Sequence, residues 1–252
     1  MLAGLDRRLA RLIRKGYYCI AALDHGLSSG ETEGLSTLRE LSECCSELHH
    51  CGFPAVVLNA GVLDNIKLPS HLSIVAQLVG MPMHSLNAID RVPLAMPHAA
   101  ITAGADAVSI QLRIDAGYNG TIIERLALIS QEAHKLGMPV VLMLNGDKWS
   151  SLKHFLGAVR SLSEFGVDLI KVSPGNYIAE LQEEVLADLS VPLLYPGGEL
   201  SADYHKHVKM AAVAGYAGVC VGRNLFQSST SFQDQIEMLD SAFSKSQVVG
   251  PA

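Results

Sequence analysis

The chain has 252 residues, of which 49% are hydrophobic and 17% charged, and its formal net charge is -6. This composition excludes a disordered or fibrous chain, and the acidic balance argues against nucleic acid as the main partner. No apolar run reaches the ~18 residues that a membrane span needs, so we expect no membrane partner. The five cysteines are scattered without a Cys-x-x-Cys pair, which favours a reduced, cytoplasmic protein over a secreted disulfide scaffold.

The N-terminal segment and an internal repeat organise the chain. Residues 1–16 place Arg and Leu at helical spacing, which predicts an amphipathic cap helix rather than a signal peptide. Further along, a helix-like stretch repeatedly ends in glycine, and an apolar run begins three residues later. Glycine readily adopts the left-handed conformation that ends a helix. The repeat occurs at Gly52, Gly104, Gly137, Gly166 and Gly215.

The apolar runs are typical of strands that are buried on both faces of a parallel sheet. With three further runs they make eight predicted strands, at 18–23, 55–58, 73–78, 107–110, 140–143, 169–172, 192–195 and 218–221. Eight strands separated by helical segments predict an α/β fold, a (β/α)8 TIM barrel, with an open doubly wound sheet as the alternative. We expect one domain over residues 1–252, with a C-terminal helix and tail at 228–252. The gap between the second and third predicted strands is short, so the assignment of these two strands has the least support from the sequence.

Lys171 is a charged residue near the end of an otherwise apolar predicted strand. The chemistry of a barrel lies where its strands end, so this position is a candidate for catalysis. It stands within Leu169-Ile-Lys-Val172, where an ammonium ion is costly to bury. Burial favours the neutral amine, which is a nucleophile toward carbonyl groups. The sequence therefore predicts a Schiff-base lysine. The alternative is a lysine that extends to solvent or pairs with a carboxylate.

Asp24 and His25 directly follow the first predicted strand. A carboxylate at this position can orient a substrate hydroxyl, hold a lysine ammonium or move protons. The alternative for Asp24 is a helix cap or a loop ion pair. His25 is a candidate to share the acid–base work, or else a hydrogen-bonding loop residue. Other polar residues at predicted strand ends are Asn59, Gln77, Gln111, Arg113, Asn145 and Asp147.

Two glycine loops follow the last two strands and predict a phosphate site. Gly197 and Gly198 end the seventh strand, and Gly222 and Arg223 end the eighth. Glycines let backbone N–H groups approach a phosphate, a helix N-terminus adds positive potential, and this is the usual phosphate site of barrels. Arg223 either adds charge to that site or braces the barrel end. No spacing collects three metal ligands, so we expect no metal and no cofactor.

Three segments resemble one known family. They are Ala22-Leu-Asp-His-Gly26, Gly166-Val-Asp-Leu-Ile-Lys-Val172 and Gly218-Val-Cys-Val-Gly-Arg-Asn-Leu-Phe-Gln227. They are similar to the archaeal-type class I fructose-bisphosphate aldolases and the aminodideoxyheptulosonate synthases, in the DeoC/LacD-like aldolase superfamily. Residues 102–108 and 133–139 also look like family segments, and the resemblance runs in register over about residues 17–227.

The resemblance implies a (β/α)8 barrel with Lys171 as the Schiff-base lysine and Asp24 as a substrate-orienting acid. It also implies a phosphate site at the two glycine loops, a homo-oligomer and no metal. The implied function is a class I aldolase acting on a phosphorylated sugar-like substrate, with dihydroxyacetone phosphate or a related ketose phosphate as donor. The alternatives are a transaldolase- or thiolase-like transfer on the same scaffold, and a non-catalytic barrel that binds sugar phosphates.

The fifth strand departs from the family pattern. Relatives end this strand with Met-Tyr-Pro-Arg-Gly, whose tyrosine is the acid–base group, whereas this chain has Met143-Leu-Asn-Gly-Asp147 with Leu144 at the tyrosine position. Leucine cannot move a proton. We therefore expect weak or absent cleavage of fructose 1,6-bisphosphate with an intact Schiff base, a specialised biosynthetic role and a substitute acid–base residue. The candidates are Asp24, Tyr195, His25 and Asp147.

Overall fold

The computed structural model describes residues 3–30, 32–83, 91–113, 120–146 and 148–244. Eight parallel strands close into a barrel, because β2 pairs with both β3 and β10. The barrel confirms the predicted (β/α)8 fold over the open sheet, and all eight predicted strands are present. They are β2 (Tyr17–Ala22), β3 (Ala55–Asn59), β4 (Ser73–Gly80), β6 (Ala107–Arg113), β7 (Val140–Asn145), β8 (Leu169–Lys171), β9 (Leu193–Pro196) and β10 (Gly218–Val221).

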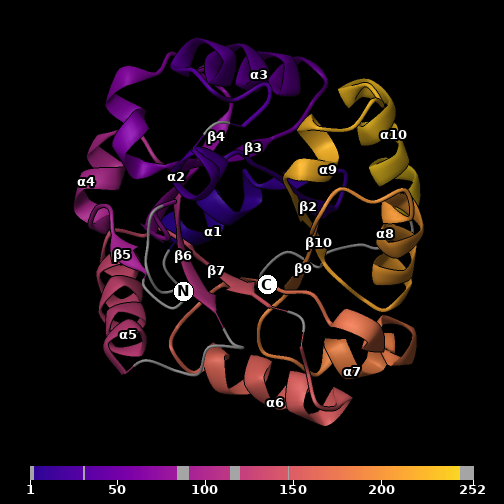
Figure 1. The fold of residues 1–252 in the computed structure, drawn as a ribbon. Coiled ribbons are helices and arrows are strands. Elements are labelled where there is room, and N and C mark those ends of the chain that lie inside the picture. Colours follow the sequence, from indigo (N-terminus) through magenta and orange to yellow (C-terminus); the bar gives the residue numbers. More distant parts are fainter. Residues whose placement is uncertain (1–2, 31, 84–90, 114–119, 147, 245–252) are drawn as a thin grey trace.

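Helices surround the barrel, which Figure 1 shows along its axis. The longer ones are α3 (Leu38–His50), α5 (Gly120–Lys135), α6 (Leu152–Ser163), α8 (Tyr204–Val213) and α10 (Phe232–Ala242). Shorter ones are α2 (His25–Ser29), α4 (Pro97–Thr102), α7 (Glu183–Ala187) and α9 (Arg223–Phe226). The 3-10 helices η1 (Ala60–Asn65) and η2 (Gly175–Glu180) complete the ring, and η1 alone connects β3 to β4 across the short predicted gap.

The helix ends follow the local sequence. Thr37 and Glu40 form a capping box at the start of α3, in which the Thr37 side chain accepts a hydrogen bond from the Glu40 amide. All five glycines of the sequence repeat have positive φ, between 67° and 94°. This conformation is open to glycine at little cost, so the repeat predicted from the sequence marks real helix ends.

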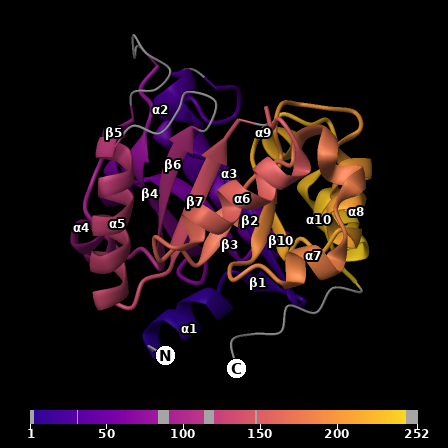
Figure 2. The same ribbon diagram turned by 90° about the horizontal axis from the view of Figure 1, so that it is seen from below.

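The N-terminal helix is shorter than the predicted cap over residues 1–16. Helix α1 covers Ala3–Ala10, and β1 (Ile13–Arg14) then pairs antiparallel with β2. Lys15 and Gly16 have φ values of 44° and 89° between the two strands, as a tight two-residue hairpin requires. Helix α1 still lies across one end of the barrel, as Figure 2 shows. Leu9 and Leu12 pack there against the interior residues.

The hydrophobic core has two layers. The inner layer fills the barrel and includes Val57, Val141, Met143, Leu169 and Leu194. The outer layer lies between the strands and the helices, and it contains the residues that alternate with these, such as Leu142, Ile170 and Leu193. Successive residues of a strand point to opposite faces, so membership of a layer shows which side chains reach the interior.

A short strand pair extends β4 at the end of the barrel opposite α1. Strand β5 (Val92–Pro93) pairs antiparallel with the last residues of β4. Figure 2 places it beside α2, above the carboxyl ends of the parallel strands. None of the helices described is long and apolar enough to cross a membrane.

Candidate active site

Lys171 is the last residue of β8, and its side chain enters the barrel. In the strand register it lies opposite Met143 of β7 and Leu194 of β9. Both of these residues belong to the inner layer, as does Leu169, two residues earlier. The Lys171 amine lies near the thiol of Cys220, from β10, and acts to lower the pKa of that thiol. Burial raises the pKa of this thiol, so the amine has a neutral thiol as its neighbour.

Asp24 and His25 lie at the same end of the barrel as Lys171. Asp24 is 8% exposed, and its Oδ2 accepts a hydrogen bond of 2.7 Å from the Gln111 amide. Asp24 occupies the N-cap position of α2, but its side chain makes no capping hydrogen bond. The carboxylate is therefore directed into the barrel, and the helix-cap interpretation of Asp24 does not describe its contacts.

His25 has an imidazole that favours the neutral form. Burial lowers its pKa, the charge of Asp24 opposes that effect, and the charges of Lys171 and Arg223 lower the pKa further. Its Nδ1 is buried and has no hydrogen-bond partner among the residues that the structure describes. The ring packs edge-on against Phe226, with centroids 5.1 Å apart. His25 thus presents a neutral imidazole close to both Asp24 and Lys171.

The two glycine loops are in direct contact. A Cβ atom on Gly197 would lie 3.2 Å from the backbone nitrogen of Gly222, and one on Gly222 would lie 2.4 Å from Cε1 of His25. Side chains at these positions would separate the loops or displace the imidazole. Gly198 has a φ of 66°, which is open to glycine at no steric cost.

Arg223 and Asn224 follow Gly222 and have different roles. The Arg223 guanidinium is 41% exposed and lies 4.0 Å from the exposed Glu199 carboxylate, a separation at which a surface ion pair contributes little. The Asn224 amide is buried, donates to the carbonyls of Gly197 (2.5 Å) and Glu199 (2.7 Å), and accepts from the amide of Ser201 (2.8 Å). Asn224 therefore fixes the loop after β9, leaving the Arg223 charge facing solvent.

The structure does not bring Tyr195 together with Lys171. Tyr195 follows the inner residue Leu194, and its ring packs in the outer layer, 5.6 Å from the ring of Tyr216. Burial also raises the pKa of the Tyr195 phenol. Asp147 lies outside the described residues.

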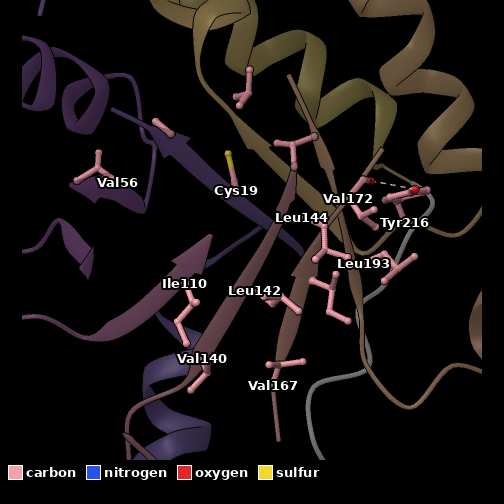
Figure 3. Close-up of a cluster of buried hydrophobic side chains, with 14 of the residues drawn as sticks. Cys19, Val56, Ile110, Val140, Leu142, Leu144, Val167, Val172, Leu193 and Tyr216 are labelled. Carbon is pink, nitrogen blue, oxygen red and sulfur yellow. Dashed lines mark hydrogen bonds between the residues drawn. The ribbon is translucent and has the colours of Figure 1, made fainter. Parts of the chain in front are cut away.

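Leu144 also faces away from the barrel interior. It is 4% exposed and belongs to the outer layer with Val172, Leu193 and Tyr216, as Figure 3 shows. The inward residues at the end of β7 are Met143 and, two positions later, Asn145. A tyrosine at position 144 would consequently point toward the helices, and the residue that faces the mouth of the barrel is Asn145.

Sequence reasoning missed the roles of three polar residues. Gln111 and Asn145 stand at strand ends, and counting alternate residues from an inward neighbour would have selected both. Asn224 lies within the motif at 218–227 that resembles the family. Its hydrogen bonds to the loop after β9 form only because the fold brings β9 and β10 together. Among the described residues, no three His, Cys, Asp or Glu side chains gather as a group of metal ligands.

Known proteins match this chain over most of its length. A family model described as "DeoC/LacD family aldolase" matches residues 18–228. The chain is 28% identical to 2-amino-3,7-dideoxy-D-threo-hept-6-ulosonate synthase 1 of Archaeoglobus fulgidus, over 90% of this chain and 86% of that protein. It is 27% identical to 2-amino-3,7-dideoxy-D-threo-hept-6-ulosonate synthase of Halobacterium salinarum, over 90% and 87%.

Solved structures show the same fold. A crystal structure of an archaeal fructose 1,6-bisphosphate aldolase superposes with a TM-score of 0.76 at 23% identity, covering 97% of this chain and 98% of the other. An archaeal fructose-1,6-bisphosphate aldolase whose catalytic lysine is bound to a carbinolamine intermediate gives 0.76 at 22% identity, covering 98% and 100%.

Proposed function

Because the chain belongs to the DeoC/LacD aldolase family, we propose that its Lys171 forms a Schiff base with a phosphorylated ketone. Dihydroxyacetone phosphate or a related ketose phosphate is the proposed donor. The observation that carries this proposal is the amine at the end of β8, inside the barrel, in register with the inner residues Met143 and Leu194. Asp24 and His25 are its ionisable neighbours.

The proposed reaction begins at the amine. Lys171 attacks the carbonyl carbon to give a carbinolamine, which loses water to form an iminium ion. The iminium acidifies the adjacent C–H, and removal of that proton gives an enamine that attacks an acceptor aldehyde. Water then returns to hydrolyse the product iminium and release the amine. Asp24 and His25 are the described groups placed to accept and return the protons.

The glycine loops are the proposed phosphate site. Gly197, Gly198 and Gly222 leave their backbone free of side-chain atoms where the two loops touch. Arg223 adds a cation at the same edge, which suits a charge-assisted hydrogen bond to a phosphate oxygen. With the phosphate held at β9 and β10, the carbonyl of a short ketone phosphate is within reach of the neighbouring β8.

Carbon–carbon bond formation is the proposed direction. Both relatives described above are named as synthases of an amino-heptulosonate, which supports this direction. We therefore propose a specialised biosynthetic aldolase rather than a cleaving one. Transfer between two sugar phosphates on the same scaffold remains the second candidate. The family resemblance also implies a homo-oligomer. This stays a prediction, which a light-scattering measurement of the molar mass would test.

Borohydride trapping tests the proposed function. The protein is incubated with dihydroxyacetone phosphate and sodium borohydride, and the reduced adduct is mapped by mass spectrometry. We expect the adduct on Lys171, its loss in Lys171→Arg, and full labelling in the control Lys206→Arg, whose side chain is exposed on α8. An adduct on another lysine, or none with a panel of phosphorylated ketones, would contradict the proposal and favour a non-catalytic barrel.

A further inference from the structure

Gln111 joins opposite parts of the barrel at the level of the proposed site. It lies on β6, and its side-chain amide donates a 2.7 Å hydrogen bond to Oδ2 of Asp24, which follows β2. Strands β3 and β4 separate β6 from β2 in the sheet. The bond therefore crosses the interior of the barrel and does not join neighbouring strands.

The contact fixes the Asp24 carboxylate in a way that its own segment does not. The Asp24 backbone carbonyl is held separately, by a 2.9 Å hydrogen bond from the Asn59 amide. The residue is 8% exposed, and its carboxylate takes no part in capping α2. A buried carboxylate needs donors to offset its lost hydration. With Oδ2 bound to Gln111, Oδ1 is the oxygen left to face the amine or a substrate.

The neighbouring polar side chains leave the Gln111 amide free to turn its NH2 group toward Asp24. Ser109, two residues earlier and 0% exposed, donates to the side-chain oxygen of Gln77, and the Gln77 amide donates to the Val79 carbonyl. These groups satisfy one another and do not compete for Gln111. An ionised carboxylate only accepts hydrogen bonds, so the Gln111 NH2 group is the end that turns toward Asp24.

We propose that Gln111 is a positioning residue, which holds the Asp24 carboxylate so that its second oxygen faces the reacting centre. This inference rests on the proposed function, in which Lys171 forms the imine. Titratable or charged groups around this centre, among the described residues, include His25, Lys171, Cys220 and Arg223, and Arg113 stands two residues after Gln111 on the same face of β6. Gln111 itself stays uncharged at all pH values, and its amide orients the acid without exchanging protons.

Two near-isosteric variants test the proposal, Gln111→Met and Gln111→Glu. Imine formation is measured in single turnovers, by quenching with borohydride at increasing concentrations of dihydroxyacetone phosphate. Both variants are expected to lower the maximal rate on the order of 10- to 100-fold, because a displaced group near the reacting atoms costs this much. The half-saturating concentration should stay unchanged, because the glycine loops are intact. Gln233→Met and Gln233→Glu, at an exposed glutamine of α10, are the matched controls.

The pH dependence separates positioning from a purely structural effect. In Gln111→Glu the introduced acid faces the Asp24 carboxylate, and two carboxylates at this distance share a proton as the pH falls. The shared proton restores a donor toward Asp24, so the rate of Gln111→Glu relative to Gln111→Met should rise at lower pH. Using this ratio cancels the pH effects of the other ionisable groups of the site, which both variants retain.

Three results would overturn the positioning role. They are wild-type maximal rates in both variants, a loss confined to the half-saturating concentration, and a rate ratio that does not change with pH. Melting temperatures of all variants identify losses that come from unfolding. Failure of the wild-type protein to form an adduct at Lys171 would instead contradict the proposed function.

Discussion

Two alternative functions are open to Arg223, binding an anion and bracing the barrel end, and its surroundings distinguish between them. Its distant contact with Glu199 is exposed on both sides, whereas the neighbouring Asn224 makes the hydrogen bonds that hold the loop. The bracing function therefore belongs to Asn224. The Arg223 guanidinium keeps its charge directed toward solvent at the edge of the glycine loops.

Arg223→Ala should raise the KM for phosphorylated substrates by roughly 10-fold or more, because a charge-assisted hydrogen bond contributes ~1.5–3 kcal/mol. The maximal rate of imine formation should change little, since the amine and Asp24 are untouched. Steady-state kinetics with a phosphorylated ketone and its unphosphorylated counterpart provide the measurement. Equal KM values for mutant and wild type would show that the residue contributes nothing to phosphate binding.

At the scale of the element, the pleat of β7 decides which side chains reach the site. Leu142 and Leu144 lie in the outer layer, while Val141 and Met143 lie in the inner one. A resemblance in sequence register placed the family tyrosine at Leu144, but the strand turns that position toward the helices. We still predict weak or absent cleavage of fructose 1,6-bisphosphate, because neither Met143 nor Asn145 can transfer a proton.

Leu144→Tyr should destabilise the protein without restoring cleavage. Leu144 is 4% exposed, and inserting a larger side chain into a packed layer costs about 1–3 kcal/mol. Asn145→Tyr is the comparison. Asn145 is exposed at the mouth of the barrel, so this variant should leave the melting temperature nearly unchanged. Thermal unfolding and a fructose 1,6-bisphosphate cleavage assay are the measurements. A gain of cleavage in Leu144→Tyr would mean that position 144 reaches the barrel interior.

At the scale of the whole molecule, Asp240 joins the two ends of the chain. Its carboxylate on α10 accepts hydrogen bonds from Arg14, Lys15 and Tyr17, at 2.8–2.9 Å. Burial alone would raise the pKa of Asp240, but these three partners together lower it to about 2. The first strands of the chain are thereby held against its last long helix.

Asp240→Asn should lower the free energy of unfolding by about 2 kcal/mol at neutral pH, since each unit of pKa shift corresponds to about 1.4 kcal/mol. A lowered carboxyl pKa stabilises the fold above the ordinary value of 3.8 and loses that effect as the pH falls through about 2. The difference between mutant and wild type should therefore shrink below about pH 4. Denaturant unfolding at several pH values measures it.

Asp188→Asn, at an exposed aspartate after α7, is the control for removing a negative charge. It should alter the unfolding free energy by no more than about 0.5 kcal/mol, as surface substitutions usually do. A similar loss in both variants, or a loss in Asp240→Asn that persists at the lowest pH, would contradict a stabilising role for the Asp240 carboxylate.

The sequence by itself determined the barrel, because its signals are local and repeat. Glycine at helix ends and doubly buried apolar runs specify each strand and helix independently, and all eight strands appear where those runs lie. The positions of Lys171, Asp24 and the glycine loops at strand ends were also predictable from the sequence, and their roles stay predictions. The tertiary structure alone decided which side chains face one another. Residues as distant in sequence as Asp24 and Gln111 meet only when the sheet closes, and Leu144 and Tyr195 turn outward only because the closed sheet has an interior.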